Sequence, residues 1–307
     1  MTARILVIKL GALGDVVLSL GPFAAIRDAH RDTHITLLTT APYAGFMEDS
    51  PYFNEIWTDI RPKLVRARSW LALRRRLRGG NFDFVYDLQT SDRSNWYYRL
   101  MGPGHRPHWS GIAPSCSHPH LNSDRDNMHT AERQAEQLSH AGISSVPPAD
   151  LSWLSADINR FGLAARIVLL APGGAAHRPE KRWPAKSFAA LAREFAARGV
   201  EPVVVGGVQE RDLAQAIRAH CPDTRDLTGE TSFADIAVLA RNAAGAVGND
   251  TGPMHLIVAA GCPALILFSA ASNPALTQPW GRDVSVLKSE DLAELSVADV
   301  AAALSLR

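Results

Sequence analysis

Cysteine is scarce in this chain, and the three that occur lie far apart. Cys116, Cys221 and Cys262 form no CxxC pair. This pattern supports neither a disulfide framework nor a zinc site, and it is typical of proteins from a reducing compartment. We interpret all three as small thiols packed in the interior, and we expect a cytoplasmic protein.

The chain also lacks a strong net charge and a long hydrophobic run. Its 32 basic and 31 acidic residues nearly cancel, so composition predicts no nucleic-acid partner. No apolar stretch approaches the roughly 20 residues that cross a bilayer as a helix. Residues 1–21 resemble a signal peptide, but Lys9 and Asp15 interrupt the apolar run. That segment has the pattern of a strand, a turn and a helix.

Short β-rich runs alternate with helical patterns along the chain, which predicts parallel α/β units. A length of 307 residues suits two domains, 1–150 and 151–307, facing each other across a cleft. We expect the hinge between the domains near residues 145–160 and a loop over 103–129. The last helix packs either on its own domain or back on the first domain. The expected strands are Arg4–Leu10, His34–Thr39, Phe84–Leu88, Ile167–Ala171, Val203–Val205, Gly245–Val247 and Ala264–Phe268. The expected helices are Asp15–Ala29, Ser91–Leu100, Pro184–Arg198, Glu210–His220, Phe233–Arg241, Gly252–Ala260 and Val297–Leu304.

The loop after the first strand is one candidate for chemistry, because ligands of such folds bind beyond the carboxyl ends of the strands. Gly11 and Gly14 permit a tight turn and leave room for a substrate. Asp15 follows in the first helical turn, where the helix dipole favours an anion. The loop is neither a Walker A sequence nor GxGxxG. From position alone, helix capping by Asp15 is the stronger interpretation, and catalysis is the alternative.

The segment GNDTGPMHLIVAAG, residues 248–261, is the most specific in the chain. Thr251, Gly252 and Pro253 lie at a predicted helix N-terminus, where N–H groups and the dipole attract phosphate. Asp250 either caps this helix or accepts a bond from a ligand hydroxyl. His255, one turn in, either faces the cleft or packs.

Two further loops contribute to the same predicted nucleotide site. The segment APGGAAHRPEKRWP has glycines after a strand and two cations before a helix; these are Gly173, Gly174, Lys181 and Arg182. Such cations suit a diphosphate leaving group, and a solvated charged loop is the alternative. Glu210, beyond the next strand, either holds a ribose diol or caps a helix.

Three segments of the chain resemble the lipopolysaccharide heptosyltransferase family, glycosyltransferase family 9, over nearly the whole length. They are ILVIKLGALGDVVLSLGP, KRWP and GNDTGPMHLIVAAGCPALILFS. The resemblance implies a GT-B fold with an N-terminal acceptor-binding and a C-terminal donor-binding Rossmann-like domain. It also implies an ADP-heptose donor, inversion at the anomeric carbon, no metal or other cofactor, and a lipid-linked inner-core glycan of the Kdo–lipid A type as acceptor.

The same resemblance assigns roles to single residues. Asp15 matches the proposed catalytic base, Lys181 a lysine at the donor phosphates, and Glu210 a ribose-binding acid. The matching nucleotide-binding turn comprises Asp250, Thr251, Gly252 and His255. The family often has Leu-Pro where this chain has Leu20-Gly21-Pro22. A transferase of another nucleotide sugar to a different surface glycan, and a non-catalytic nucleotide-sugar-binding homologue, stay open as alternatives.

The segment 61–80 has eight basic residues and no acidic one. A basic amphipathic helix there would dock on anionic lipid or phosphorylated lipid A through Arg74, Arg75 and Arg76, and a solvated helix face is the alternative. We expect a peripheral protein at the inner face of the cytoplasmic membrane. The histidines of the expected loop fit no HExxH pattern, so we interpret them as acceptor-loop or incidental residues. These are His105, His108, His118, His120 and His129.

Overall fold

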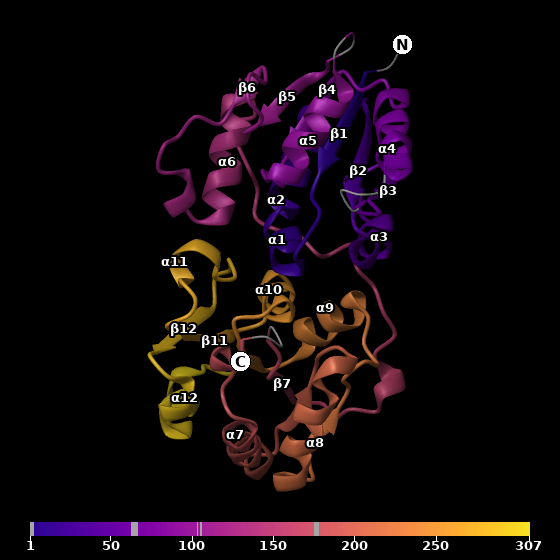
Figure 1. Cartoon of the computed structure of the whole chain (residues 1–307). Coiled ribbons are helices and arrows are strands. Elements are labelled where there is room, and N and C mark those ends of the chain that lie inside the picture. Colours follow the sequence, from indigo (N-terminus) through magenta and orange to yellow (C-terminus); the bar gives the residue numbers. More distant parts are fainter. Residues whose placement is uncertain (1–2, 63–66, 103, 105, 175–177) are drawn as a thin grey trace. The chain divides into compact units, whose positions relative to one another are not determined.

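The computed structural model describes residues 3–62, 67–102, 104, 106–174 and 178–307. The chain divides into two compact units, Met1–Ala149 and Asp150–Arg307. In the described parts of the chain, each unit is built on one six-stranded sheet with helices around it (Figure 1). All pairs of neighbouring strands are parallel.

The first sheet has the strand order β3-β2-β1-β4-β5-β6. Its strands are β1 (Arg4–Ile8), β2 (His34–Thr39), β3 (Glu55–Thr58), β4 (Phe84–Asp87), β5 (His108–Gly111) and β6 (His118–Pro119). The helices are α1 (Leu13–Leu18), α2 (Leu20–Ala29), α3 (Ala41–Glu48), α4 (Ala67–Gly79), α5 (Asp92–Met101) and α6 (Thr130–His140). Leu6 and Ile8 of β1 share a core with Leu73 and Tyr97 of α4 and α5. Strand β1 is almost wholly apolar because helices cover a parallel sheet on both faces.

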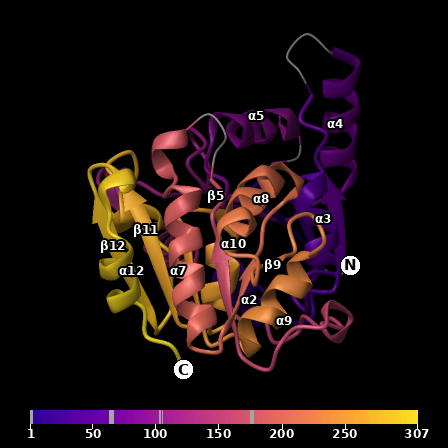
Figure 2. The same ribbon diagram turned by 90° about the horizontal axis from the view of Figure 1, so that it is seen from below.

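The second sheet repeats this order as β12-β11-β10-β7-β8-β9. Its strands are β7 (Ile167–Ala171), β8 (Glu201–Val204), β9 (Arg225–Asp226), β10 (Gly245–Asn249), β11 (Ala264–Ser269) and β12 (Val284–Ser289). The helices are α7 (Ala185–Ala197), α8 (Arg211–His220), α9 (Phe233–Asn242), α10 (Gly252–Ala259), α11 (Pro274–Thr277) and α12 (Val297–Ala303). Helix α12 packs on α7 and β12 of its own unit (Figure 2), with Val300 fully buried in that core.

Both sheets therefore have the doubly wound order, in which the chain returns to the middle of the sheet after its third strand. The order reverses between β1 and β4 in the first unit and between β7 and β10 in the second. Loops at such a switch point leave a crevice in which ligands bind. The predicted α/β class is confirmed. No helix formed by the described residues is long and apolar enough to cross a membrane.

Two expectations about local structure are wrong. The helix predicted over 15–29 is two helices separated at Ser19, whose hydroxyl donates to the Asp15 carbonyl at 2.7 Å. Because α2 restarts at Leu20, Pro22 falls in a first turn, where its missing N–H costs no hydrogen bond. The loop predicted over 103–129 contains β5 and β6. These strands are short, and only their parallel pairing, β5 with β4 and β6 with β5, defines them.

Candidate functional site

Asn249 organises the edge of the second sheet. It ends β10 and is fully buried. Its Nδ2 donates to the carbonyls of Pro172 at 2.8 Å and Gly173 at 3.1 Å, and its Oδ1 accepts from the Trp183 N–H at 3.0 Å. These partners lie on both ends of the loop that follows β7, the neighbouring strand. One buried amide therefore holds that loop against β10.

Asp250, the next residue, joins three loops. Its Oδ2 accepts from Lys181 Nζ at 3.3 Å and from Ser272 Oγ at 2.8 Å. Lys181 ends a 3₁₀ turn, Pro179–Lys181, after β7, while Ser272 follows β11. The side chains of Lys181 and Asp250 are 16% and 14% exposed, so the ion pair is mostly buried and part of it reaches the surface. The sequence did not single out Ser272, and no local pattern marks it.

Glu210 lies in the turn that follows β8, at the same edge of the sheet. It is 6% exposed, and its Oε2 accepts from the Gly207 N–H at 2.7 Å, which is the capping alternative. The structure also packs it against the loop after β7, because a Cβ on Gly173 would lie 3.0 Å from its Cγ. A Cβ on Gly206 would lie 3.1 Å from its Cβ. Both glycines thus let backbone approach this carboxylate closely.

The N-terminus of α10 lies beside the Lys181–Asp250 pair in sequence and space. Thr251 is its N-cap residue, Gly252 its first residue, and Pro253 its second. Within the part of the chain that the structure describes, the Thr251 side chain accepts no capping bond. N–H groups of a first turn carry partial positive charge toward an anion. His255, in the first turn of α10, is 7% exposed.

Arg182 turns toward its own loop. Its Nη2 donates to the Gly174 carbonyl at 2.5 Å, which braces the segment around residues 174–182. The guanidinium therefore stabilises the glycine loop in addition to bringing positive charge to it. Lys181, the neighbouring residue, is the cation that reaches across to another strand's loop.

The first unit carries Asp15 at the corresponding edge. Asp15 is partly buried, and its Oδ2 accepts from the Ala12 N–H at 3.1 Å, so it caps α1 as its position predicts. Gly14 is buried inside α1. Gly11 has φ +119°, and a Cβ there would lie 2.5 Å from Cε2 of Tyr43, so this turn requires glycine. Tyr43 of α3 covers the turn.

Lys9 and Asp87 are buried at the switch point of the first sheet, next to this turn. Lys9 is 4% exposed and its Nζ donates to the Leu88 carbonyl at 3.1 Å. Burial lowers the pKa of the Lys9 ammonium, and the charges of Asp15 and Asp87 oppose that effect. Burial raises the pKa of Asp87 to about 6. Hydrogen bonds from Ser94, Thr90 and Gln89 and the charge of Lys9 lower this pKa but do not offset the effect of burial. A lysine in an apolar strand was the only sequence signal.

Two arginines add positive charge to this edge. Arg61 Nη2 donates to the Leu10 carbonyl at 3.0 Å, and it follows β3. Arg133 of α6 has its pKa lowered mainly by burial, while the charge of Asp15 raises it. Asp15 therefore lies in the field of two cations, Lys9, which follows β1, and Arg133 of α6.

The histidines do not form a metal centre in the described residues. His108 and His118 lie against Phe84, with ring centroids 5.9 and 5.0 Å away. His129 accepts from the Ala131 N–H at 3.2 Å and caps α6. Among the described residues, no group of three His, Cys, Asp or Glu side chains is arranged to hold a metal ion. His105 lies outside the described residues.

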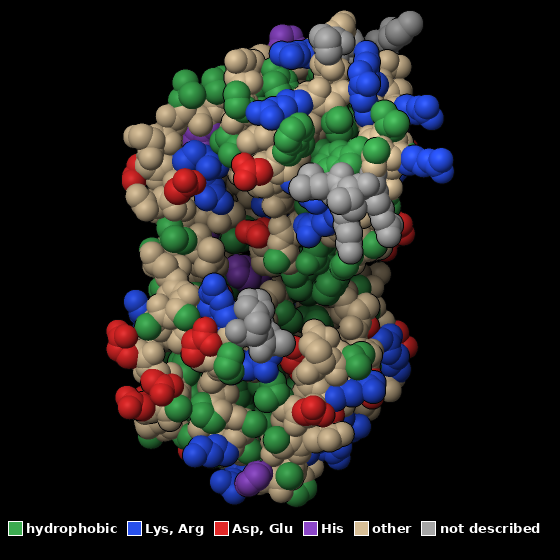
Figure 3. Space-filling model, in the orientation of Figure 1, with side chains coloured by type: hydrophobic (Ala, Val, Ile, Leu, Met, Phe, Trp, Pro, Cys, Tyr) green, Lys and Arg blue, Asp and Glu red, His purple; other side chains and the backbone are tan. Residues whose placement is uncertain are grey.

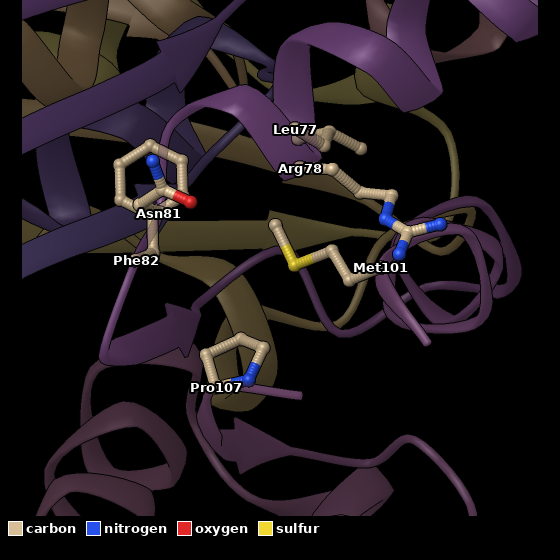
Figure 4. Close-up of a pocket in the computed structure, with 6 residues that line it drawn as sticks. All are labelled: Leu77, Arg78, Asn81, Phe82, Met101 and Pro107. Atoms are coloured by element: carbon tan, nitrogen blue, oxygen red, sulfur yellow. The ribbon is translucent and has the colours of Figure 1, made fainter. Parts of the chain in front are cut away.

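The first unit also contains a small pocket (Figure 4). Its volume is about 150 Å³, and it is lined by Leu77, Arg78, Asn81, Phe82, Met101 and Pro107. Phe82 and Pro107 precede β4 and β5, so the pocket is at the amino ends of these strands. The candidate residues follow the carboxyl ends, at the opposite edge of the same sheet.

Comparison with known proteins places the chain among sugar transferases. Residues 70–300 match the family model described as glycosyltransferase family 9 (heptosyltransferase). A lipopolysaccharide heptosyltransferase 3 of Escherichia coli is 22% identical, over 93% of this chain and 89% of the relative. The structure of a family 9 glycosyl transferase from Veillonella parvula superposes with a TM-score of 0.85 and 23% identity, over 98% of this chain and 95% of that one. E. coli heptosyltransferase WaaC with ADP gives a TM-score of 0.77 and 19% identity, covering 97% of each. The predicted GT-B fold is confirmed by these likenesses and the two doubly wound sheets.

Proposed function

Because the chain belongs to glycosyltransferase family 9 and is a glycosyltransferase, we propose that it transfers a heptose from ADP-heptose to a lipopolysaccharide inner-core acceptor of the Kdo–lipid A type. The transfer inverts the anomeric carbon and requires no metal ion. Supporting this donor, relatives that match nearly the full length are lipopolysaccharide heptosyltransferases, and one solved neighbour contains ADP. The observation that carries the proposal is the meeting of Lys181, Asp250 and Ser272 at the switch point of the second sheet.

In this proposal the second unit binds the donor. A diphosphate takes the place of Asp250 as the partner of Lys181, and the N–H groups at Thr251–Gly252 face its oxygens. Asp250 is then free to accept from a donor hydroxyl, and Glu210 to accept from the ribose. Gly173 and Gly174 allow the nucleotide to approach backbone, with Arg182, Pro253 and His255 shaping the loop and helix around it.

The first unit then binds the acceptor, and Asp15 acts as general base. Its carboxylate takes the proton of the acceptor hydroxyl as that oxygen bonds to the anomeric carbon. The bond from that carbon to the phosphate oxygen breaks, and its electron pair leaves with the diphosphate. A positioned base contributes about 10²–10⁴-fold to such a step. Gly11 and Gly14 hold the turn that presents Asp15, and Lys9 and Arg133 attract its charge.

Lys181 and the α10 N-terminus carry the charge stabilisation in this mechanism. Both are positioned before the donor arrives, so little reorganisation accompanies departure of the diphosphate. Loss of one preorganised donor of this kind costs about 3–4 kcal/mol of transition-state stabilisation. With a lipid-linked acceptor, the enzyme acts in the cytoplasm at the inner face of the membrane as a peripheral protein.

Calorimetric titration with ADP, UDP, GDP and dTDP in the absence of divalent metal tests the donor. We expect selective ADP binding that Lys181→Ala weakens. Preference for another nucleotide would be consistent with a glycosyltransferase but would overturn the assignment of ADP-heptose as the donor. Binding of none of them favours a non-catalytic homologue.

Transfer from ADP-heptose to a Kdo–lipid A acceptor tests the base. We expect Asp15→Asn to lower the rate at least 100-fold while the affinity for ADP is unchanged, because Asn keeps the size and the cap of α1. Near-full activity of Asp15→Asn would overturn the assignment.

A further inference from the structure

Helices α4 and α5 pack side by side and present a surface with arginines and large apolar side chains. We call the exposed set Arg68, Leu71, Arg75, Trp96 and Arg99 the α4–α5 surface. Positions 68, 71 and 75 recur at helical spacing and form one stripe of α4. Leu73 and Leu77 on the opposite side of α4 are buried in the core. The outward stripe is therefore a surface feature and not a consequence of core packing.

The apolar members of this surface are unusually exposed. Leu71 is 50% and Trp96 is 49% exposed. The guanidinium of Arg99 lies over the Trp96 ring, 4.8 Å from its centroid, and that of Arg93 lies 5.9 Å from the Trp70 ring. Trp and Leu beside arginines are the composition of segments that lie in a bilayer interface, where the rings enter and the cations meet lipid phosphates.

The charge of this surface is predominantly positive, with three arginines and one acidic residue. Helix α4 contains no acidic residue, and α5 contains one, the exposed Asp92, which lies one turn before Trp96 on the same face of the helix. Figure 3 shows Lys and Arg side chains grouped at the upper right, where Figure 1 draws α4, with apolar side chains beside them. Such a surface is complementary to an anionic bilayer and not to a neutral one.

The structure changes which arginines of α4 serve this role. Arg74, Arg75 and Arg76 are consecutive, so they point about 100° apart around the helix and cannot meet one plane. Arg76 stacks on Trp57 at 4.5 Å and donates to the Thr58 carbonyl at 3.3 Å, which holds it against β3. Arg75 is exposed on the stripe, and Arg74 is only partly exposed. Residues 63–66 of the basic segment lie outside the described residues.

The α4–α5 surface begins near the edge of the sheet that carries Asp15 and runs along both helices. Both helices follow strands of a parallel sheet, β3 and β4, so their first turns lie nearer the carboxyl ends of the strands. Leu71 and Trp96 fall in the second turns of their helices. A bilayer on this surface therefore reaches the edge of the sheet at which a lipid-linked acceptor would arrive.

We infer that the α4–α5 surface docks on an anionic lipid bilayer. Leu71 and Trp96 enter the interface, and Arg68, Arg75 and Arg99 meet lipid phosphates. This inference rests on the proposed function in one respect, which is that the acceptor is linked to a lipid. Each arginine at an anionic surface strengthens binding about fivefold, so three together give about 100-fold.

Vesicle sedimentation of the full chain tests this. The probes are vesicles of phosphatidylcholine alone and of equal parts phosphatidylcholine and phosphatidylglycerol. We expect binding only to the anionic vesicles, with a blue shift of tryptophan fluorescence that Trp96→Phe abolishes. The triple variant Arg68→Glu, Arg75→Glu, Arg99→Glu should lose at least 100-fold in affinity, and Leu71→Ser with Trp96→Ala about tenfold.

A matched control reverses the same number of charges on exposed positions of the second unit. It is Arg193→Glu, Arg211→Glu, Arg218→Glu on α7 and α8. The inference fails if the wild type ignores anionic vesicles, or if control and α4–α5 variants lose binding equally. ADP titration of each variant reports on the folded second unit, so loss of docking with intact ADP binding is distinct from failure of the proposed transferase activity.

Discussion

Replacing Asn249 by alanine tests whether one buried amide positions the donor loop. Three hydrogen bonds disappear, and two carbonyls and one N–H are left without the partner that satisfied them. Each buried polar group left unsatisfied costs about 1–3 kcal/mol. Even at the lower bound, the second unit should lose about 3 kcal/mol of unfolding free energy. That corresponds to a fall of roughly 6–12 °C in its melting temperature.

The assay is calorimetric melting together with ADP titration. Because Asn249 fixes Gly173 and Trp183 at the two ends of the loop, we expect ADP affinity to fall about tenfold along with stability. The control is Asn242→Ala, in which an exposed amide that donates to the Val238 carbonyl at 2.8 Å is removed. Its effect should stay within about 0.5 kcal/mol. A loss below about 1 kcal/mol in Asn249→Ala, with unchanged ADP affinity, would refute the reasoning.

Three further changes have defined outcomes. A Cβ on Gly248 would lie 2.7 Å from the Ala171 Cβ, so Gly248→Ala should cost about 1–3 kcal/mol in chemical denaturation. The control Gly45→Ala, with nothing within 4 Å inside α3, should be neutral or stabilising by about 0.5 kcal/mol; equal effects of the two would contradict the packing argument. Asp87 has a pKa raised from 3.8 to about 6, so between those pH values the unfolded state releases its proton first and stability falls as pH rises. This titration changes the unfolding free energy by about 3 kcal/mol. Asp87→Asn should not show this change when its unfolding free energies at acid and neutral pH are compared. A pH dependence equal to that of the wild type would contradict the assignment. Lys181→Ala should weaken ADP binding at least about tenfold, whereas exposed Lys186→Ala should not, and calorimetric titration of both variants decides between specific and general charge effects.

Local sequence was enough to place the strand–turn–helix segments. The apolar run of β7 followed by glycines, and the Gly-Pro start of α10, carry their own conformational preferences, so these elements and the loops between them were predictable. The cap formed by Asp15 was also predictable, because its partner Ala12 lies three residues away. Periodicity and turn residues therefore determine the order of the elements and the strand ends at which ligands can bind.

Tertiary structure decided which of those loops meet. Lys181 finds Asp250 across 69 positions, and Lys9 reaches Leu88 across 79, because the strand order brings β7 beside β10 and β1 beside β4. Strand order depends on how crossovers bury apolar faces, which no local pattern encodes. Ser272 and Asn249 went unnoticed for the same reason: a serine or asparagine becomes informative only when its partners are known. The sequence determined the chemistry available at each strand end, and the packing of the sheets determined which groups act together.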